Sequence, residues 1–295
     1  MRRLMVLSRF FLHLLVPVLL ASPAIAADPP MLVTVEWLSR QLERPDLRIV
    51  DMSTEREGYR TGHVPGAVYL NIDDVRIAVP AGGYRLPSAE EATRLFAALG
   101  IGPDTSVVIY DDAGGLHASR LFFTLEAFGH ERVAIVDGGR QRWQVAGLPL
   151  AQQGVKGWTA PGYTARLRTD RVATAETIKS RLGAPDIVLV DARSPEEYAG
   201  SDVRAKHGGH IPGAVNVDWR LNLNRDGTFK RIEELRRMYT AEGVTPDKTV
   251  VTYCQTQHRA SHTYFVLRLL GYPRVAGYDR SWSEWGNRTD LPIAR

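Results

Sequence analysis

The strongest constraint on the fold is an internal repeat that runs through most of the 295-residue chain. The segment Leu47–Asp51 matches Ile187–Asp191, and each has the apolar character of a buried strand that ends in an aspartate. The turn sequence GHVPGAV at 62–68 returns as GHIPGAV at 209–215, where proline and glycine supply the backbone angles of a turn. Two copies of one pattern predict two domains of the same architecture, each large enough for its own core.

The elements between these landmarks also occur twice, and strand patterns alternate with helix patterns. Thr34 and Thr174 are N-cap candidates for the first helix of each copy, and residues 88–91 form a capping box in the first copy. Strand patterns recur at 107–110 and 250–253. This alternation is typical of parallel sheets. We therefore predict an α/β fold with two tandem domains, each a parallel sheet covered by helices on both faces.

The domain boundaries follow from where the repeat weakens. The first copy occupies residues 31–148 and the second occupies residues 171–295. Between them, residues 149–170 contain three glycines and two prolines and show little periodicity, which is typical of a linker.

The N-terminus has the three parts of an export signal. Three arginines precede an apolar run at 10–20, which is too short to span a bilayer, and Ala24-Ile25-Ala26 is a small-x-small cleavage site. The alternative, a membrane anchor, is disfavoured because His13 and Pro17 interrupt the run. We predict a signal peptide at 1–26 and a mature protein that is periplasmic or secreted.

Removal of this signal changes what the net charge implies. Without Arg2, Arg3 and Arg9, the chain has 34 rather than 37 basic residues, against 33 acidic residues. A nearly neutral mature protein supports binding neither to nucleic acid nor, after signal cleavage, to a membrane. The chain also has a single cysteine, so an exported form has no internal disulfide and keeps one thiol for another purpose.

That cysteine, Cys254, lies where a predicted strand ends and a predicted helix begins. The β-branched run 249–253 precedes it, and an apolar-periodic segment at 260–270, closed by Gly271, follows it. Free backbone N–H groups and the positive end of the helix dipole at such a junction favour a thiolate and hold an anion. Arg259 adds a full positive charge. A buried, inert cysteine is the alternative, but the polar loop and the arginine favour a reactive thiol.

The repeat supplies an internal control for this interpretation. Cys254 aligns with Asp111, and the loop that follows Asp111 has no cysteine and no arginine where Arg259 would fall. Arg193, two residues after a strand-ending aspartate, is replaced by Ser53 in the first copy. The first copy is therefore predicted to keep the scaffold and to lack the chemistry.

A duplicated α/β domain with GHIPGAV-type turns and one Cys-x4-Arg loop in the C-terminal copy resembles the tandem-domain rhodaneses, which are thiosulfate or mercaptopyruvate sulfurtransferases. The resemblance implies that Cys254 is the nucleophile and that residues 254–259 form the active loop. It also implies that Arg193 binds the anionic donor. Residues 279–285 look like the family's C-terminal motif, with Arg280 where glycine is usual.

What the resemblance implies for activity is transfer of sulfane sulfur from thiosulfate to cyanide or a thiol acceptor through a Cys254 persulfide. The expected partners are this small anionic donor and a nucleophilic acceptor, and a monomer is expected. No metal-ligand spacing or glycine-rich nucleotide loop is evident, so no metal or cofactor is expected. The insertion before the second histidine turn adds the cationic candidates Arg204, Lys206 and His207. The predicted substrate-binding residues are Arg259, Arg193, Gln255, Thr256, Gln257 and His258.

For three histidines the sequence favours structural roles over catalytic ones. His258 at this spacing favours a role in shaping the loop over a titrating role. His63 and His210 occur in both copies, including the one without chemistry, so they are interpreted as turn-stabilising.

Alternatives to a thiosulfate sulfurtransferase remain open. The loop CQTQHR is similar to the loops of bacterial thiosulfate-type members and lacks the small residues of mercaptopyruvate enzymes, which leaves a 3-mercaptopyruvate sulfurtransferase as the second candidate. A persulfide carrier that delivers sulfur to a partner protein is a third. Phosphatases and arsenate reductases of similar fold use a Cys-x5-Arg loop, whereas only four residues separate Cys254 from Arg259.

Overall fold

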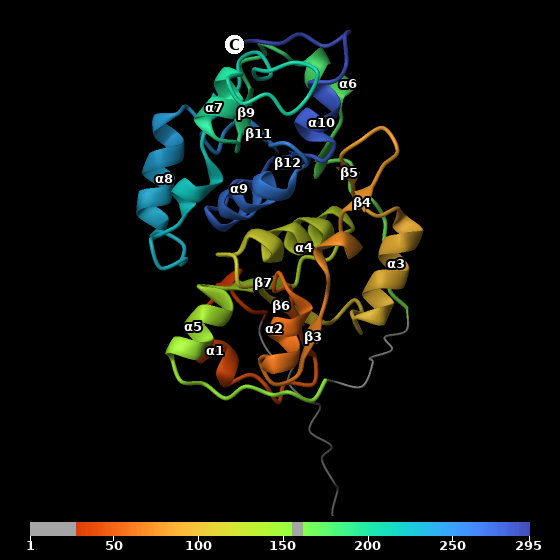
Figure 1. Cartoon of the computed structure of the whole chain (residues 1–295), viewed down its shortest axis with the longest axis vertical. Coiled ribbons are helices and arrows are strands. Elements are labelled where there is room, and N and C mark those ends of the chain that lie inside the picture. Colours follow the sequence, from red (N-terminus) through yellow and green to blue (C-terminus); the bar gives the residue numbers. More distant parts are fainter. Residues whose placement is uncertain (1–27, 155–161) are drawn as a thin grey trace, which may run out of the picture.

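The structure, a computed structural model, describes residues 28–154 and 162–295. The predicted signal peptide at 1–26 lies outside these residues, as does part of the predicted linker. Two α/β domains are stacked on each other, with the N-terminal domain in red to yellow-green and the C-terminal domain in green to blue (Figure 1). The predicted fold class is confirmed.

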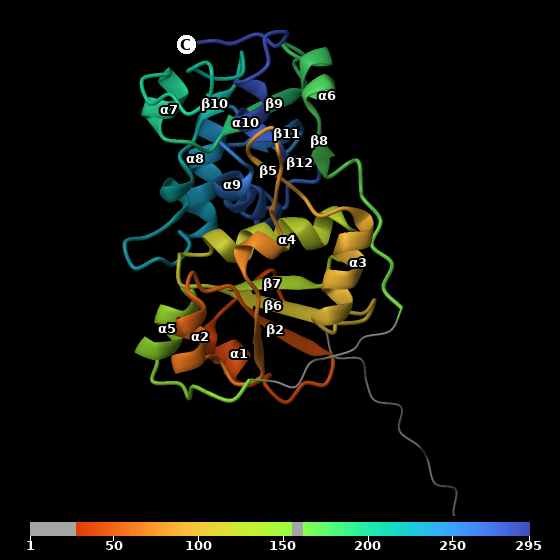
Figure 2. The same ribbon diagram turned by 45° about the vertical axis from the view of Figure 1, so that its right-hand side comes forward.

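The first domain is built on a five-stranded sheet in which every pairing is parallel. Its strands, in spatial order, are β1 (Leu32–Val33), β7 (Val133–Val136), β6 (Ser106–Tyr110), β2 (Leu47–Asp51) and β3 (Ala67–Tyr69). Helices cover both faces, as Figure 2 shows. They are α3 (Ala89–Ala98) and α4 (Leu116–Ala127) on one face, with α1 (Val35–Ser39), α2 (Arg56–Thr61) and α5 (Gly139–Val145) on the other.

The second domain repeats this sheet with the same strand order. Its parallel strands are β8 (Val172–Ala173), β12 (Val275–Tyr278), β11 (Thr249–Tyr253), β9 (Ile187–Asp191) and β10 (Val215–Asn216). Its helices are α6 (Ala175–Ser180), α7 (Pro195–Ala199), α8 (Ile232–Ala241), α9 (His258–Leu269) and α10 (Ser281–Trp285). Outside the sheets lie the 3-10 turns η1 (Ile72–Asp74) and η2 (Trp219–Asn222) and a hairpin of β4 (Ile77–Ala78) and β5 (Tyr84–Arg85).

Most helix ends follow the predicted caps. The hydroxyl of Thr34 accepts a hydrogen bond from the Trp37 N–H (3.1 Å), and residues 88–91 form the predicted capping box. Gly271 has φ +82° after the last turn of α9. Helix α9, however, begins at His258, two residues before the predicted start, because Gln257 takes a left-handed conformation (φ +56°) that turns the chain into the helix.

The largest hydrophobic core spans both domains. It lies between the two sheets and includes the buried faces of α3, α4, α8 and α9. Aromatic pairs join α4 to α9, with ring centroids 4.9 Å apart for Phe122 and Phe265 and 5.0 Å apart for Phe123 and Tyr264. Smaller cores under α1 and α5, and under α6 and α10, cover the outer faces. Because burial of apolar surface is the main stabilising term in folding, this shared core holds the domains in one orientation.

Candidate active site

Cys254 lies directly after β11, and only four residues separate that strand from α9. Its thiol is free, and the residue is only 1% exposed. The side chain packs in a small cluster with Ala192 and Ala260, and the partly buried Trp219 covers the cluster. The strand-to-helix position that the sequence predicted is therefore confirmed.

The first turn of α9 supplies unpaired backbone donors. Across residues 28–154 and 162–295, the N–H groups of His258, Arg259 and Ala260 have no hydrogen-bond acceptor, and the first helical bond at this end is from Ser261 N–H to the Gln257 carbonyl (3.0 Å). Such donors, together with the helix dipole, stabilise a negative charge placed before the helix. Cys254 is the first residue of the loop that leads into these N–H groups.

Residues after β12 hold this loop from outside. The Trp282 N–H donates to the Cys254 carbonyl and the Ser283 N–H donates to the Gln255 carbonyl, both at 2.9 Å. The Ser281 hydroxyl oxygen accepts from the N–H groups of Gln257 (2.9 Å) and Cys254 (3.3 Å). Sequence reasoning singled out the 279–285 motif but not the Ser281 hydroxyl, because nothing local in the sequence shows that it reaches the loop.

The predicted loop residues divide into two groups. Gln255 and Thr256 lie at the partly exposed rim, where the Gln255 Nε2 donates to the Arg204 carbonyl (3.0 Å). Gln257 is fully buried, and its carboxamide points into the domain, where it is satisfied by Thr252 and by the carbonyl of Tyr278. The Gln257 side chain is thus a structural anchor of the loop, and binding of substrate by Gln257 stays a prediction.

Arg259 is paired with a buried carboxylate. Its Nη1 and Nη2 donate to the two oxygens of Glu197, at 2.5 and 2.8 Å, and Glu197 is 1% exposed. Burial lowers the pKa of Arg259, but the bonds to Glu197 and the nearness of Cys254 outweigh it and raise the pKa overall. Arg259 therefore places a permanent positive charge near the thiol, with its hydrogen-bonding edge directed toward Glu197.

Arg193 is also paired and fully buried. Its Nη2 donates to Asp191 (2.5 Å) and to the Gly209 carbonyl (2.7 Å), and its Nε donates to both oxygens of Asp191. Its guanidinium lies 4.5 Å from the ring of Trp282. The side chain is only 1% exposed, and among the described residues its Nη1 has no hydrogen-bond partner. These contacts support the site, and binding of the anionic donor by Arg193 stays a prediction.

His258 points from the loop toward the first domain. Its ring centroid lies 5.0 Å from that of His117 at the start of α4. Burial, followed by the charges of His117, Arg76 and Arg120, holds the pKa of His258 well below its usual value. The imidazole is therefore neutral at pH 7, in keeping with the predicted role in shaping the loop.

His63 and His210 perform the same structural task in the two domains. The Nδ1 of His63 hydrogen-bonds the Tyr59 carbonyl (2.8 Å), and that of His210 hydrogen-bonds the Tyr198 carbonyl (3.0 Å). Each ring is stacked on the same tyrosine. The turn-stabilising interpretation is confirmed by this geometry.

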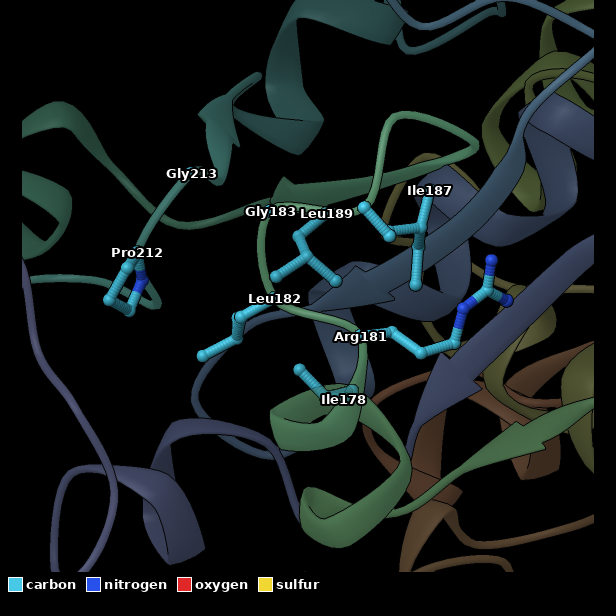
Figure 3. A pocket seen from close by; sticks show the side chains of 9 residues that line it. Ile178, Arg181, Leu182, Gly183, Ile187, Leu189, Pro212 and Gly213 are labelled. Carbon is cyan, nitrogen blue, oxygen red and sulfur yellow. The ribbon is translucent and has the colours of Figure 1, made fainter.

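Of the remaining cationic candidates, Arg204 is paired with carboxylates, since its Nη2 lies 2.7 Å from Asp202 and its Nε lies 3.7 Å from Glu197. Lys206 and His207 are held through their backbones, by the Asn287 side chain (2.9 Å) and the Trp282 indole N–H (3.2 Å). A hollow at the start of β9, lined mainly by apolar side chains around Ile178, Leu182 and Leu189, includes none of the predicted site residues (Figure 3). It opens at the amino end of the strands, whereas Cys254 follows their carboxyl end.

Two further observations concern metal binding and membrane spanning in the described residues. Within residues 28–154 and 162–295, no group of three or more His, Cys, Asp or Glu side chains could hold a metal ion. In the same residues, no helix combines the length and the apolar character needed to cross a membrane.

Two domains of this fold, with one cysteine at the carboxyl end of the second sheet, define the class of protein. The model of the rhodanese-like domain matches residues 34–146 and 174–288. The chain therefore belongs to the rhodanese family, as a tandem-domain enzyme of the thiosulfate sulfurtransferase type.

Individual relatives cover almost the whole chain. It is 36% identical to a thiosulfate sulfurtransferase of Pseudomonas aeruginosa over 92% of this chain and 99% of that protein. It is 38% identical to the sulfur carrier protein TtuD of Thermus thermophilus over 91% of this chain and 98% of that protein. A solved anaerobic ergothioneine biosynthesis enzyme from Chlorobium limicola is 27% identical, with a TM-score of 0.80 over 90% of this chain and 70% of that one.

Proposed function

We propose that the protein transfers sulfane sulfur from thiosulfate to a nucleophilic acceptor, cyanide or a thiol, through a persulfide on Cys254. The observation that carries this proposal is the position of the thiol before the unpaired N–H groups of His258, Arg259 and Ala260. Donors in this arrangement stabilise both a thiolate and the negative outer sulfur of a persulfide.

The proposed reaction has two displacement steps. The Cys254 thiolate attacks the outer sulfur of thiosulfate, the sulfur–sulfur bond of the donor breaks, and sulfite leaves with the bonding electron pair. The acceptor then attacks the outer sulfur of the persulfide, and Cys254 leaves as a thiolate. The positive charge of the partly buried Arg259 supports the anionic state of the sulfur at both stages.

Thiosulfate is proposed over 3-mercaptopyruvate because the rim carries Gln255 and Thr256, which suit hydrogen bonding to a sulfonate. The thiosulfate sulfurtransferase relatives from Pseudomonas aeruginosa and Azotobacter vinelandii, each 36% identical, support this choice. A second candidate is a carrier that passes the persulfide sulfur to a partner protein, which the relationship to TtuD favours.

The cellular setting is also a proposal. The arginines, the apolar run and the Ala-x-Ala sequence before residue 27 support export to the periplasm or secretion. We also propose that the mature protein is a monomer. Mass spectrometry of the protein recovered from a cell fractionation checks both the cleavage after Ala26 and the compartment.

The decisive experiment is intact-mass measurement of the mature protein after incubation with thiosulfate. The wild type is expected to gain one sulfur atom and to lose it on addition of cyanide, whereas Cys254→Ser gains none. Steady-state rates with thiosulfate and with 3-mercaptopyruvate, at one cyanide concentration, decide the donor. Sulfur uptake by the serine variant would contradict the nucleophile assignment, and a higher kcat/KM with mercaptopyruvate would contradict the donor assignment.

A further inference from the structure

Ser281 has a backbone conformation that serine rarely adopts. Within the described parts of the chain, only two non-glycine residues have positive φ, namely Ser281 (+49°) and Gln257 (+56°). The two are hydrogen-bonded to each other, since the Gln257 N–H donates to the Ser281 hydroxyl oxygen (2.9 Å). Left-handed backbone in such residues costs free energy and is kept where surrounding structure enforces it, often at functional sites.

The Ser281 hydroxyl is fully used and fully buried. It accepts from the N–H groups of Cys254 and Gln257, which lie at the two ends of the loop between β11 and α9, and it donates to the Tyr278 carbonyl (2.7 Å). The next two residues add backbone bonds to the same loop, as described above. One side chain therefore ties together both ends of the loop that carries the thiol.

The first domain provides a natural comparison. Gly139 occupies the matching place after β7 with nearly the same φ (+51°), and the next N–H, of Arg140, bonds the Asp111 carbonyl (2.8 Å). A Cβ on Gly139 would overlap the carbonyl group of Asp111. The non-catalytic copy thus uses the residue for which left-handed backbone is easy, and the copy with the thiol has a serine despite the conformational cost.

The first domain also forms hydrogen bonds with the segment that carries Ser281. Asp279 accepts the Leu86 N–H (2.5 Å) and the Nη2 of the fully buried Arg120 (2.9 Å). Arg280 reaches the carbonyls of Tyr84 and Gly82, both at 3.4 Å. Residues 279–283 therefore contact the active loop on one side and the N-terminal domain on the other.

We propose that Ser281 is a positioning residue that sets the geometry of Cys254 relative to the N–H groups of α9, and that the N-terminal domain acts on catalysis by holding Ser281 in place through Asp279. This inference rests on the proposed function of Cys254 as nucleophile. Ser281 acts through the loop backbone, and it supplies no proton to the reaction. Small errors in the placement of a nucleophile are known to cost large factors in rate.

Ser281→Gly and Ser281→Ala test the proposal, with Ser119→Ala as the control. Ser119 is equally buried but lies in the first domain, and its hydroxyl has no partner among the described residues. Glycine relieves the left-handed backbone, so Ser281→Gly is expected to be more stable than Ser281→Ala. Both are expected to lose at least about tenfold in kcat with a smaller change in KM, while Ser119→Ala retains the wild-type kcat.

Iodoacetamide alkylation of Cys254 across pH gives a readout that needs no sulfur donor. The Ser281 variants are expected to react with a profile displaced to higher pH, because a loosened loop stabilises the thiolate less well. Asp279→Asn keeps a side-chain oxygen for the Leu86 N–H but removes the charge facing Arg120, and it should shift the profile in the same direction by less. If the Ser281 variants do not fold, the alkylation profile of Asp279→Asn tests the proposal in their place.

The outcomes are separable from those of the proposed function. A wild-type protein that gains no sulfur from either donor would overturn the sulfur-transfer proposal, and the alkylation profiles would still report on Ser281. A folded Ser281→Gly variant with wild-type kcat and an unchanged profile would overturn the positioning role. An unchanged profile in Asp279→Asn would overturn the role of the first domain.

Discussion

The loops that follow β6 and β11 each place an acidic side chain before the N–H groups at the start of a helix. The side chain is a carboxylate in the first domain and a thiol in the second. In the first domain the Asp111 carboxylate, 1% exposed, fills the space before α4. It accepts four backbone N–H groups, those of Ala113 (3.0 Å), Gly115 (2.8 Å), His117 (2.8 Å) and Ala118 (2.9 Å). In the second domain Cys254 stands at that place, and the N–H groups of the first turn of α9 have no acceptor among residues 28–154 and 162–295. The fold thus provides backbone N–H donors for an anion in both domains. In the first domain the Asp111 carboxylate already occupies these donors.

The two loops also differ in length. Five residues separate β6 from α4, but four separate β11 from α9, and the left-handed residues Gly115 and Gln257 end the two loops. Counted from these residues, His117 takes the place of Arg259. The sequence alignment of Asp111 with Cys254 holds at the strand end, and the extra residue lies in the first loop. The additional residue gives the first loop enough length for the Asp111 carboxylate to accept N–H groups of that same loop.

A second difference lies at the ends of β2 and β9. Asp51 accepts the Ser53 N–H (2.7 Å) and the Tyr110 hydroxyl (2.5 Å), and burial raises its pKa despite these bonds. Asp191, in the second domain, instead holds the guanidinium of Arg193. At this strand end the second domain thus has a buried ion pair, whereas Asp51 of the first domain accepts from the uncharged donors Ser53 and Tyr110.

The largest effect on the free energy of unfolding is expected from removal of the Asp111 carboxylate in the first domain. Asp111→Ala removes the acceptor of four N–H groups, and since hydrogen bonds to a charged group contribute about 1.5–3 kcal/mol each, we expect a loss of at least about 4 kcal/mol in the free energy of unfolding. Asp111→Asn, which keeps one acceptor oxygen, should lose about half as much. Urea denaturation measures both, with Asp112→Ala as a control. Equal losses for the two Asp111 variants would refute this account of the loop.

The next effect concerns the ion pair of Arg259 with Glu197 beside the loop of the second domain. Arg259→Ala removes the guanidinium that pairs with both oxygens of the buried Glu197 and leaves it only the more distant Arg204 Nε (3.7 Å) and the Ser194 N–H (3.3 Å). Loss of one member of a buried pair costs about 3–5 kcal/mol. The double variant Arg259→Ala/Glu197→Ala should lose clearly less stability than the sum of the single variants. A thermodynamic double-mutant cycle measures this coupling, and additive losses would show that the pair is energetically irrelevant.

Acid is expected to weaken both domains through buried histidines whose pKa is lowered, namely His258, described above, together with His130 and His262. Burial lowers the pKa of His130 in the first domain, and of His262 between the domains, to about 4. Because the unfolded chain binds these protons at about pH 6.5, stability is full above that pH and falls as the pH drops toward 4, by about 3 kcal/mol for each histidine.

The matched variants separate these two contributions. His262 hydrogen-bonds Asn222 and the Gly114 carbonyl of the other domain, so His262→Asn should remove the interdomain part of the pH dependence. His130→Asn should remove the part internal to the first domain. Urea midpoints at pH 7 and pH 5 test both, and an unchanged difference between the two midpoints in either variant would count against that histidine.

The smallest effect is expected at Arg280, where the first domain has Gly138 in the matching position. Its two bonds to the hairpin carbonyls are long, at 3.4 Å. Arg280→Ala should therefore change the free energy of unfolding by less than about 1 kcal/mol, in the range of exposed polar contacts. Thermal denaturation measures the change, and a loss above about 2 kcal/mol would give Arg280 a larger part in domain docking.

The sequence alone determined the duplicated architecture and the location of the thiol. Strand and helix patterns, the caps at Thr34 and at 88–91, and the turns at 62–68 and 209–215 are local signals, each contained within a few residues. Because these signals agree along both copies, the order of strands and helices and the position of Cys254 at a strand end could be predicted.

Only the tertiary structure decided the partners of the side chains around that thiol. Arg259 meets Glu197 across 62 residues of sequence, and the bond from Arg120 to Asp279 joins groups 159 residues apart. The left-handed Ser281 lies 27 residues from Cys254 in the chain, yet its hydroxyl accepts the N–H of that residue. Such pairings depend on how whole elements pack, since a hydrogen bond forms only within about 3.5 Å and in a narrow range of angles, and no local pattern in the sequence encodes that distance.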